Sequence, residues 1–321
     1  PNPKPQTPNP QPLKILIIVY LFKTSINRMK RCLMLSGQGA FLSNMFKYLD
    51  NLTALGITET PKIQRIIKHI KLHDEDTIKK RTELTQPAVV INAYLKFMKN
   101  RETIIGENGL DYILASSVGE FSALAISEML PFEDVLDLVE FRGQLMAKFF
   151  KRIPGTTYII VASPEVVSEK ISQTPGKKFE ISSIFSEKTC MLSGYAADCS
   201  KPFIKDLFKG IAIKGISFNY AFHHSMLKEI APTLMEKLRS FSFQDPKIKF
   251  FSNATNEEFT KENAATLLCQ QLYSPVLFAD NAKRVIPEIE QCFDLDSEGF
   301  FSGILRNKEQ NMKKIFLSVE N

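Results

Sequence analysis

Hydrophobic positions along this chain follow two periods, one typical of a buried strand and one typical of an amphipathic helix. The apolar run at residues 112–115 predicts a buried strand. Directly after Ser116 the spacing changes, and Val118, Phe121 and Leu124 fall on one face of a predicted helix. Because the two patterns meet at a pair of adjacent serines, we expect the chain to turn sharply from strand to helix there.

Other stretches nearer the amino terminus carry clear element boundaries. The run Cys32-Leu-Met-Leu35 predicts the first buried strand, and Gly37-Gln-Gly39 after it predicts a tight turn. Residues 62–83 mix basic and acidic side chains with isoleucines, which predicts a surface helix. Thr85-Gln-Pro87 predicts the start of the next helix, with the threonine as cap and the proline in the first turn, and this helix continues to Met98.

Short strand and helix patterns alternate between residues 155 and 215 and indicate a smaller unit. Strands are predicted at residues 157–161, 180–184, 189–192 and 212–214, and helices at residues 164–172 and 202–208. This order, β-α-β-β-α-β, is that of a ferredoxin-like unit. Lys201, Lys205 and Lys209 recur every four residues at its second helix and share one face. Such a stripe is typical of solvated surface, and docking of an acidic protein is the alternative.

The first 28 residues are predicted to lie outside the folded body. Residues 1–12 are proline-rich and typical of a disordered tail, and the apolar run at residues 13–22 is too short to cross a bilayer as a helix. No acidic residue precedes Asp50, whereas several basic residues do, among them Lys14, Lys23, Arg28, Lys30 and Arg31. The segment is either a targeting leader, for mitochondria or another organelle, or a translated upstream region ahead of Met29, which would leave the protein cytoplasmic.

Composition narrows the classes of function. Charged residues make up 24% and hydrophobic residues 44%, which is ordinary for a soluble globular protein. The net charge of +6 is too small to predict nucleic-acid binding but suits an acidic partner. The five cysteines form no CxxC pair, and their odd number favours reduced thiols in an intracellular compartment. His69 and His73 lie one helical turn apart and could ligate a metal, but without a third ligand nearby a solvated helix face is favoured.

The strand-to-helix turn carries the first candidate chemistry. A serine at such a switch, flanked by small residues, is typical of a nucleophile elbow, and Ser117 would present its hydroxyl there. The amide of Val118, first in the new helix, would then face an oxyanion. The alternative is that Ser117 only caps the helix. With histidines at positions 69, 73, 223 and 224 alone, a base for Ser117 has few possible sources.

Six motifs, in order, resemble the malonyl-CoA:acyl-carrier-protein transacylase family, the acyltransferases of fatty acid and polyketide synthesis. They are Leu35-Ser-Gly-Gln-Gly, Thr85-Gln-Pro-Ala, Ala115-Ser-Ser-Val-Gly-Glu-Phe-Ser-Ala-Leu, a helix ending in Arg142-Gly-Gln-Leu-Met, Tyr220-Ala-Phe-His and Gln271-Leu-Tyr-Ser-Pro-Val. The resemblance implies an α/β fold, with a hydrolase-like parallel-sheet body that carries the nucleophile elbow at residues 29–152 and 217–321. It also implies an inserted ferredoxin-like subdomain at residues 153–216.

The resemblance implies roles for single residues at the elbow. Ser117 is expected to be the nucleophile, and His223 is expected to remove its proton. The other imidazole nitrogen would be held by a main-chain carbonyl, for which Gln271 is the candidate. The amides of Val118 and Gln38 would hold the oxyanion.

Two further residues are expected to contact the acyl group. Arg142 stands where the family has the arginine that grips the free carboxylate of the substrate, which a guanidinium can hold through two parallel hydrogen bonds. Without the resemblance, a surface pair with Glu140 or Asp137 would be the favoured interpretation of Arg142. Phe222 is bulky where related domains that accept methylmalonyl units carry serine, which favours an unbranched malonyl group.

The function implied by the resemblance is transfer of a malonyl group from malonyl-CoA to the phosphopantetheine thiol of acyl carrier protein, through a malonyl-serine intermediate, in fatty acid biosynthesis. The expected partners are acyl carrier protein and malonyl-CoA, without nucleic acid or a stable membrane span, and we expect a monomer. No metal and no bound redox cofactor is implied. Two alternatives stay open, an acyl thioesterase or hydrolase on the same scaffold and a non-catalytic module that binds the carrier protein.

The sequence departs from the family pattern at four places. Ser116 replaces the histidine before the nucleophile, and Ala115 replaces the first elbow glycine. An asparagine-rich strand turn of the small subdomain is replaced by Ser183-Ile-Phe-Ser186, and a Gly-Pro-Gly near the end by Asp296-Ser-Glu298. These departures bear on rate and substrate fit more than on fold.

Overall fold

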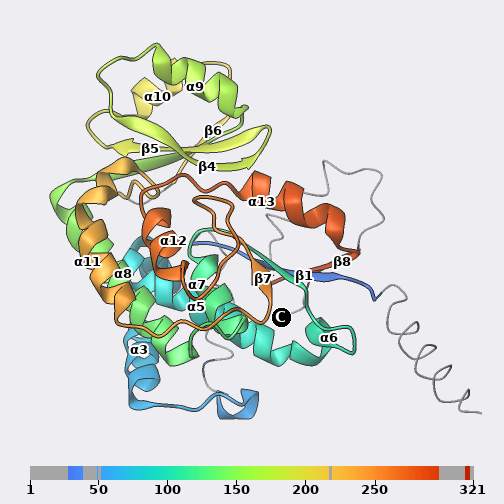
Figure 1. Ribbon diagram of the computed structural model, residues 1–321. Helices are drawn as coiled ribbons and strands as arrows, with labels where there is room; N and C mark the ends of the chain where they lie inside the picture. Colours follow the sequence, from blue (N-terminus) through green and yellow to red (C-terminus); the bar gives the residue numbers. More distant parts are fainter. Residues whose placement is uncertain (1–27, 39–48, 50–51, 217–218, 296–314, 319–321) are drawn as a thin grey trace, which may run out of the picture.

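Two separate β-sheets form the frame of the protein. The computed structural model describes residues 28–38, 49, 52–216, 219–295 and 315–318. One sheet is parallel, with strand order β7-β2-β1-β8-β9, and the other is antiparallel, with order β4-β5-β3-β6 (Figure 1). The predicted fold class, a parallel α/β body with a separate small antiparallel unit, is therefore confirmed.

The parallel sheet is built from short strands that are far apart in the sequence. Its members are β1 (Arg31–Leu35), β2 (Tyr112–Ala115), β7 (Lys249–Phe250), β8 (Gln291–Asp294) and β9 (Ile315–Ser318). The body helices are α3 (Pro61–Lys71), α4 (Glu75–Lys80), α5 (Thr82–Lys99), α6 (Arg101–Ile105), α7 (Gly119–Ile126), α8 (Phe132–Arg152), α11 (Ala231–Arg239), α12 (Ala264–Gln271) and α13 (Phe278–Val285). Short 3₁₀ helices lie at Thr53–Leu55, Ser225–Ile230 and Ile286–Glu288.

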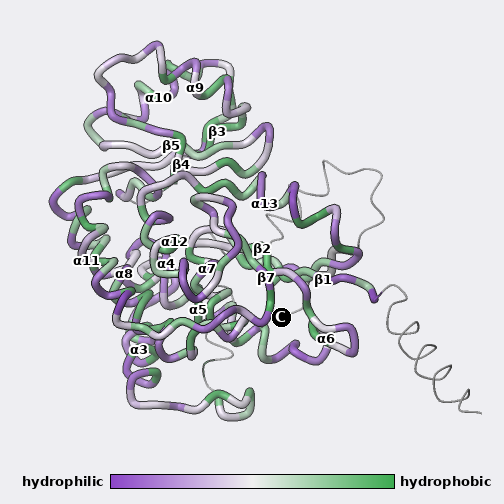
Figure 2. Tube along the Cα trace, in the orientation of Figure 1, coloured by the Kyte–Doolittle hydropathy of each residue, from purple (hydrophilic) through white to green (hydrophobic). Residues whose placement is uncertain are grey.

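Side chains on β1 alternate between two hydrophobic cores, because successive residues of a strand point to opposite faces. Leu33 and Leu35 join the large core with α5, α7 and α8, whereas Cys32 and Met34 pack with α13. All four side chains are buried, so the sheet is covered on both faces, as a parallel sheet requires. Figure 2 shows β1 and β2 as a hydrophobic centre between these layers.

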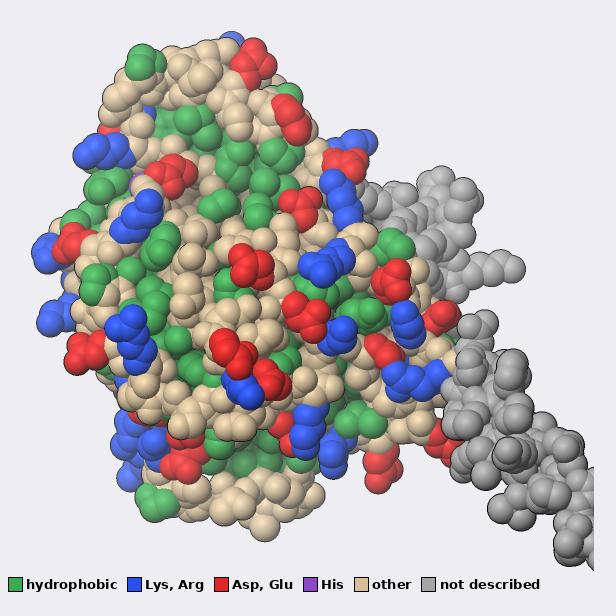
Figure 3. Space-filling model, viewed as in Figure 1, with side chains coloured by type: hydrophobic (Ala, Val, Ile, Leu, Met, Phe, Trp, Pro, Cys, Tyr) green, Lys and Arg blue, Asp and Glu red, His purple; other side chains and the backbone are tan. Residues whose placement is uncertain are grey.

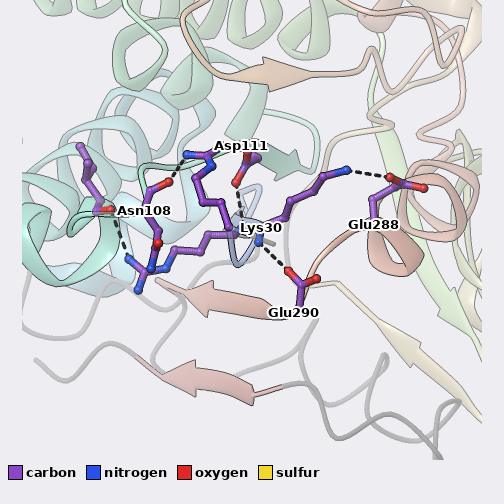
Figure 4. Close-up of polar contacts among 8 residues, drawn as sticks. Lys30, Asn108, Asp111, Glu288 and Glu290 are labelled. Atoms are coloured by element: carbon purple, nitrogen blue, oxygen red, sulfur yellow. Dashed lines mark hydrogen bonds and ion pairs between the residues drawn. The ribbon is translucent and has the colours of Figure 1, made fainter. Parts of the chain in front are cut away.

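Polar contacts fix the amino end of β1 between its two neighbours (Figure 4). The Lys30 amide donates to Glu290 Oε2 over 2.5 Å, and Lys30 Nζ lies 3.0 Å from Glu288 Oε2. On the other side the Arg31 amide donates to Asp111 Oδ2 over 2.9 Å, and Arg28 pairs with the same carboxylate. Arg28, which the sequence placed at the end of the leader, therefore contacts the folded body, as Lys30 and Arg31 do. Residues 1–27 lie outside the described residues.

The small sheet has the strand order of a ferredoxin-like unit. Its strands are β3 (Gly155–Ile160), β4 (Phe179–Ser186), β5 (Thr189–Tyr195) and β6 (Ile213–Gly215), with α9 (Pro164–Ser172) and α10 (Lys201–Leu207) in the two crossovers. Figure 1 shows both helices on the face of the sheet that is turned away from the body. The expected β-α-β-β-α-β order is confirmed, while the domain boundaries at residues 153 and 216 stay a prediction.

A segment of the body is hydrogen-bonded directly to the small sheet. The amide of Ile184 donates to the Val276 carbonyl over 2.8 Å, and the amide of Val276 donates to the Ser182 carbonyl over 2.9 Å. Ser183, in the segment that departs from the family pattern, is buried beside this bridge. The motif that begins at Gln271 therefore extends from the body into contact with the small sheet.

The helix predicted to start at Thr85 begins three residues earlier. In α5 the Thr85 hydroxyl donates to the Arg81 carbonyl over 2.9 Å, so it bonds back along the helix and does not cap it. The amide of Thr82 instead finds a partner in the Tyr220 hydroxyl, 3.3 Å away. Pro87 consequently lies inside the helix. The expected surface helix over residues 62–83 is likewise two helices, α3 and α4.

Candidate active site

Ser117 occupies the turn between β2 and α7, with a backbone φ of 53°. Its amide donates to Asn253 Oδ1 over 2.5 Å, and Asn253 Nδ2 donates to the Ala115 carbonyl over 2.9 Å. The cap of α7 is Val118, and no side chain bonds to it there. The turn is thus fastened from outside by Asn253, and the Ser117 hydroxyl is left for another partner.

That partner is the imidazole of His223. Ser117 Oγ lies 2.7 Å from His223 Nε2, and His223 Nδ1 lies 2.8 Å from the main-chain carbonyl oxygen of Gln271. Because a carbonyl oxygen only accepts, Nδ1 carries the proton and Nε2 is free to accept the proton of the hydroxyl. The pair can therefore act as nucleophile and base, with Gln271 orienting the base.

The protein keeps His223 in the neutral form that a base needs. Burial, together with the nearby Arg142 guanidinium, lowers the pKa of His223 to about 4, although the bond to the Gln271 carbonyl acts against both. The residue also has a φ of 55°, in the left-handed region, as Ser117 does. Both side chains of this pair thus lie on strained backbone, which is frequent at functional sites.

The expected oxyanion donors flank the nucleophile. The amides of Gly119 and Glu120 are bonded to the carbonyls of Ser116 and Ser117, at 2.9 and 3.0 Å, which leaves the Val118 amide, within the described residues, at the start of the helix. A helix amino terminus favours negative charge.

Gln38 approaches the elbow through the glycine before it. A Cβ added at Gly37 would lie 3.1 Å from the Ser117 Cβ, so the Gly37 backbone is in close contact with the nucleophile turn. The Gln38 side chain accepts a hydrogen bond from the Thr82 hydroxyl over 3.2 Å. The loop that carries the Gln38 amide therefore lies beside Ser117.

Arg142 projects from α8 into the interior and is only 3% exposed. Its Nη1 donates to Gln86 Oε1 over 2.6 Å, and its Nη2 donates to Gln271 Oε1 over 3.1 Å. The surface pairs considered from the sequence are not formed, because Glu140 binds Arg65 and Asp137 binds Lys237. The guanidinium thus has two neutral amide partners, and it keeps N–H groups for a further acceptor.

A buried carboxylate accompanies this cation. Glu120 is fully buried in α7, and its oxygens accept from the Asn253 amide and from Gln271 Nε2, the latter over 2.6 Å. Burial raises the pKa of Glu120 to about 8, while the two N–H donors and Arg142 act against that rise. Burial lowers the pKa of Arg142 to about 10, which leaves it protonated at neutral pH.

Phe222 precedes the base and packs in an aromatic cluster. It is buried, and its ring centroid lies 5.4 Å from that of Tyr220 and 6.4 Å from that of Phe150. The tertiary structure thus holds its ring in place next to His223. Its expected role in selecting an unbranched acyl group stays a prediction.

Three residues of the site were not identified from the sequence. Gln86 lies in the Thr-Gln-Pro-Ala motif and Glu120 in the elbow motif. Both residues were therefore quoted within motifs, but their hydrogen-bond partners were not predicted. Asn253 follows β7, where a polar residue at the end of a parallel strand is a recognisable signal. His69 and His73, by contrast, form a surface ring pair with centroids 5.6 Å apart, and no group of three metal-ligand residues occurs in the described part of the chain.

Comparisons with known proteins agree with the site. No protein-family model matches the chain. A malonyl CoA-acyl carrier protein transacylase of Staphylococcus aureus is 25% identical over 296 residues, which cover 88% of this chain and 94% of the relative. The crystal structure of the malonyl-CoA:acyl carrier protein transacylase of Helicobacter pylori matches with a TM-score of 0.74 at 24% identity, over 91% of this chain and 94% of that chain.

A second similar structure is a malonyl-transacylase in complex with its type II polyketide synthase acyl-carrier protein. It matches with a TM-score of 0.72 at 18% identity, over 89% of this chain and 94% of that chain. At these identities the solved structures show the shared fold. Taken with the six motifs and their order, these similarities confirm the resemblance of this chain to the malonyl-CoA:acyl-carrier-protein transacylase family.

Proposed function

We propose that this protein transfers a malonyl group from malonyl-CoA to the phosphopantetheine thiol of an acyl carrier protein, through a malonyl ester of Ser117, in fatty acid biosynthesis. The observation that carries the proposal is a hydrogen-bonded Ser117–His223 pair beside a buried arginine whose two recorded partners are neutral amides. A buried cation without a carboxylate bonded to it is costly, so an anionic ligand is its natural complement.

Acylation begins at the serine hydroxyl. Ser117 Oγ attacks the thioester carbonyl carbon, and its proton moves to His223 Nε2. The tetrahedral oxyanion is held by the amides of Val118 and Gln38, each such donor being worth about 3 kcal/mol of the barrier. The C–S bond then breaks, and the coenzyme A thiolate takes the proton from His223.

Transfer runs through the same groups in reverse. The carrier's phosphopantetheine thiol gives its proton to His223 and attacks the malonyl ester, and Ser117 leaves as the alcohol after taking that proton back. No metal or redox cofactor takes part in these steps. Every named group comes from one chain, so we propose that the monomer is competent.

Arg142 supplies the preference for a malonyl group. Its free N–H groups would bind the terminal carboxylate in both half-reactions, because a guanidinium matches a carboxylate through two parallel bonds. An acetyl group would leave this buried cation without an anion.

In a hydrolase, water would accept the malonyl group in place of the carrier's thiol. The choice between transfer and hydrolysis therefore depends on the carrier.

The proposed carrier docking does not need a single basic patch. Figure 3 shows acidic and basic side chains interspersed on the face in view. The stripe Lys201, Lys205 and Lys209 is exposed, but α10 lies on the side of the small sheet turned away from the body (Figure 1). A role for the stripe is therefore long-range attraction of an acidic carrier, and direct contact beside Ser117 is not expected from it.

The test is a two-stage acylation assay. The purified protein is mixed with malonyl-CoA, and intact mass and peptide mapping locate any malonyl adduct, with Ser117→Ala as the matched control. Carrier protein is then added, and malonyl-carrier and free malonate are both measured. Loading of Ser117 followed by appearance of malonyl-carrier supports the proposal. Free malonate without transfer would identify a hydrolase, and no adduct in the unaltered protein would identify a binding module.

A further inference from the structure

The fully buried carboxylate of Glu120 lies at the centre of the site, although the reaction described above does not use it. Glu120 lies in the first turn of α7, three residues after the nucleophile. One of its oxygens accepts from the Asn253 amide, and the other accepts from Gln271 Nε2 over 2.6 Å. It therefore joins three segments that are remote in sequence, and each of them carries part of the site.

Gln271 connects the catalytic pair with the carboxylate clamp. Its main-chain oxygen binds His223 Nδ1, while its side-chain Nε2 donates both to Glu120 and to the Ser117 carbonyl, the latter over 2.8 Å. Its side-chain Oε1 accepts from Arg142 Nη2 over 3.1 Å. The side-chain amide thus has one orientation that suits all partners, since a flip would bring its N–H groups against the guanidinium.

We propose that Glu120 is a positioning residue that fixes the Gln271 side-chain amide with its oxygen toward Arg142, and thereby holds the guanidinium ready for the substrate carboxylate. This inference rests on the proposed malonyl transfer. Glu120 can do this because both of its oxygens accept from N–H donors in this arrangement, so the oxygen that faces Gln271 admits the N–H end of the amide.

A glutamine at position 120 would remove this selectivity with little change in shape. A primary amide has one accepting and one donating end, whereas the two neighbours of Glu120, the Asn253 amide and Gln271 Nε2, both donate. Glu120→Gln therefore leaves one N–H facing another, or lets the Gln271 amide flip. In either case the partner of Arg142 Nη2 is weakened, while Ser117 and His223 keep their own contact.

The experiment measures loading of Ser117 from malonyl-CoA and from acetyl-CoA in parallel, with kcat and KM separated. For Glu120→Gln we expect kcat/KM for malonyl-CoA to fall about tenfold or more, largely through KM, and the value for acetyl-CoA to stay within about threefold. Gln271→Leu, which keeps the main-chain oxygen, should shift the malonyl-to-acetyl ratio in the same direction. The double variant should lose little more than either single variant, because one interaction is removed in all three.

The matched control is Glu140→Gln on α8. Glu140 is also a mostly buried glutamate, but its oxygens bind Arg65 at 2.8 and 2.5 Å and no residue of the clamp. We expect this variant to leave the malonyl-to-acetyl ratio unchanged.

The outcomes separate this inference from the proposed function. Equal loss for both substrates, an unchanged ratio, or additive effects of Glu120→Gln and Gln271→Leu would overturn the positioning role. If Glu120→Gln does not fold, an unchanged ratio in Gln271→Leu alone would overturn it. Failure of the unaltered protein to form a malonyl-serine would instead reject malonyl transfer itself.

Discussion

At the scale of single residues, burial changes the ionisation and the available partners of the side chains in the site. His223 is 4% exposed and has a pKa lowered to about 4, so it is a neutral base over most of the physiological range. Arg142 is protonated and has neutral partners, so it remains free to bind an anion. Two predictions follow from these two environments.

The pH dependence of loading should report the lowered pKa of His223. The reaction needs neutral imidazole, so the acid limb of kcat/KM should fall as pH drops through about 4, whereas an ordinary histidine would give an inflection near about 6.5. Loading rates from malonyl-CoA between pH 4 and pH 8 check this. An acid limb centred on the ordinary histidine value would contradict the buried, neutral base, provided that the fold is intact over the range by circular dichroism.

Replacing Arg142 should change the preferred substrate. Arg142→Ala removes the cation that opposes an uncharged acyl group, so kcat/KM for malonyl-CoA should fall roughly 10- to 100-fold, as expected for loss of a charge-assisted bond. Relative activity with acetyl-CoA should rise. Arg65→Ala, which removes a partly exposed arginine paired with Glu140, serves as the control. Equal losses for malonyl-CoA and acetyl-CoA would mean that Arg142 is structural.

At the scale of elements, the nucleophile turn is formed by packing of α7 onto β1. A Cβ added at Gly119 would lie 2.5 Å from the Leu35 carbonyl oxygen and 3.0 Å from that of Ser36. Only glycine allows the helix to approach the strand this closely. The glycine after the nucleophile is therefore required by this contact between two elements.

Gly119→Ala should accordingly destabilise the protein and displace the nucleophile. The clash is with backbone, which cannot move aside cheaply, so a loss of about 1–3 kcal/mol in the free energy of unfolding is expected. Denaturant unfolding and Ser117 loading are measured together. Gly215→Ala in β6 is the control, because an added Cβ there would meet only the Tyr158 ring at 3.4 Å. Wild-type stability and loading in Gly119→Ala would contradict the packing argument.

At the scale of the whole molecule, the small sheet and the body hold His223, the proposed base, between them. The Gln271–Val276 motif binds His223 at one end and the small sheet at the other. On the other side of His223, the amide of Ser225 donates to Glu180 in β4 over 3.1 Å, and the Ser225 hydroxyl bonds to the same carboxylate. In the described residues no helix is long and apolar enough to cross a membrane.

Loss of the Glu180 contact should lower the rate of Ser117 loading by more than the accompanying loss of stability would explain. Glu180→Ala removes both bonds to Ser225, so the backbone after His223 is less restrained; we expect a drop of several-fold in Ser117 loading with about 1–2 kcal/mol of stability lost. Glu229→Ala, which breaks an exposed ion pair with Arg152, should change neither measurably. Loading at the wild-type rate in Glu180→Ala would show that the small sheet does not support the base.

The sequence by itself determined the types of the elements and named the candidate residues of the site. The strand at residues 112–115 and the helix at residues 164–172 occur as expected, because burial patterns and caps are local properties. Ser117, His223, Arg142 and Gln271 were all named from motifs, and the structure brings these four together. Boundaries were less well predicted, as in α5, where a tyrosine from a distant segment meets the first turn.

Only the tertiary structure decided how the site is supported. Asn253 holds the Ser117 amide across 136 residues of sequence, and Glu120 holds the Gln271 side chain across 151. No local pattern encodes such pairs, since each polar group is satisfied by whichever partner the packed chain brings to it. The left-handed backbone at Ser117 and His223 has the same origin, because strain of this kind persists only where surrounding contacts enforce it.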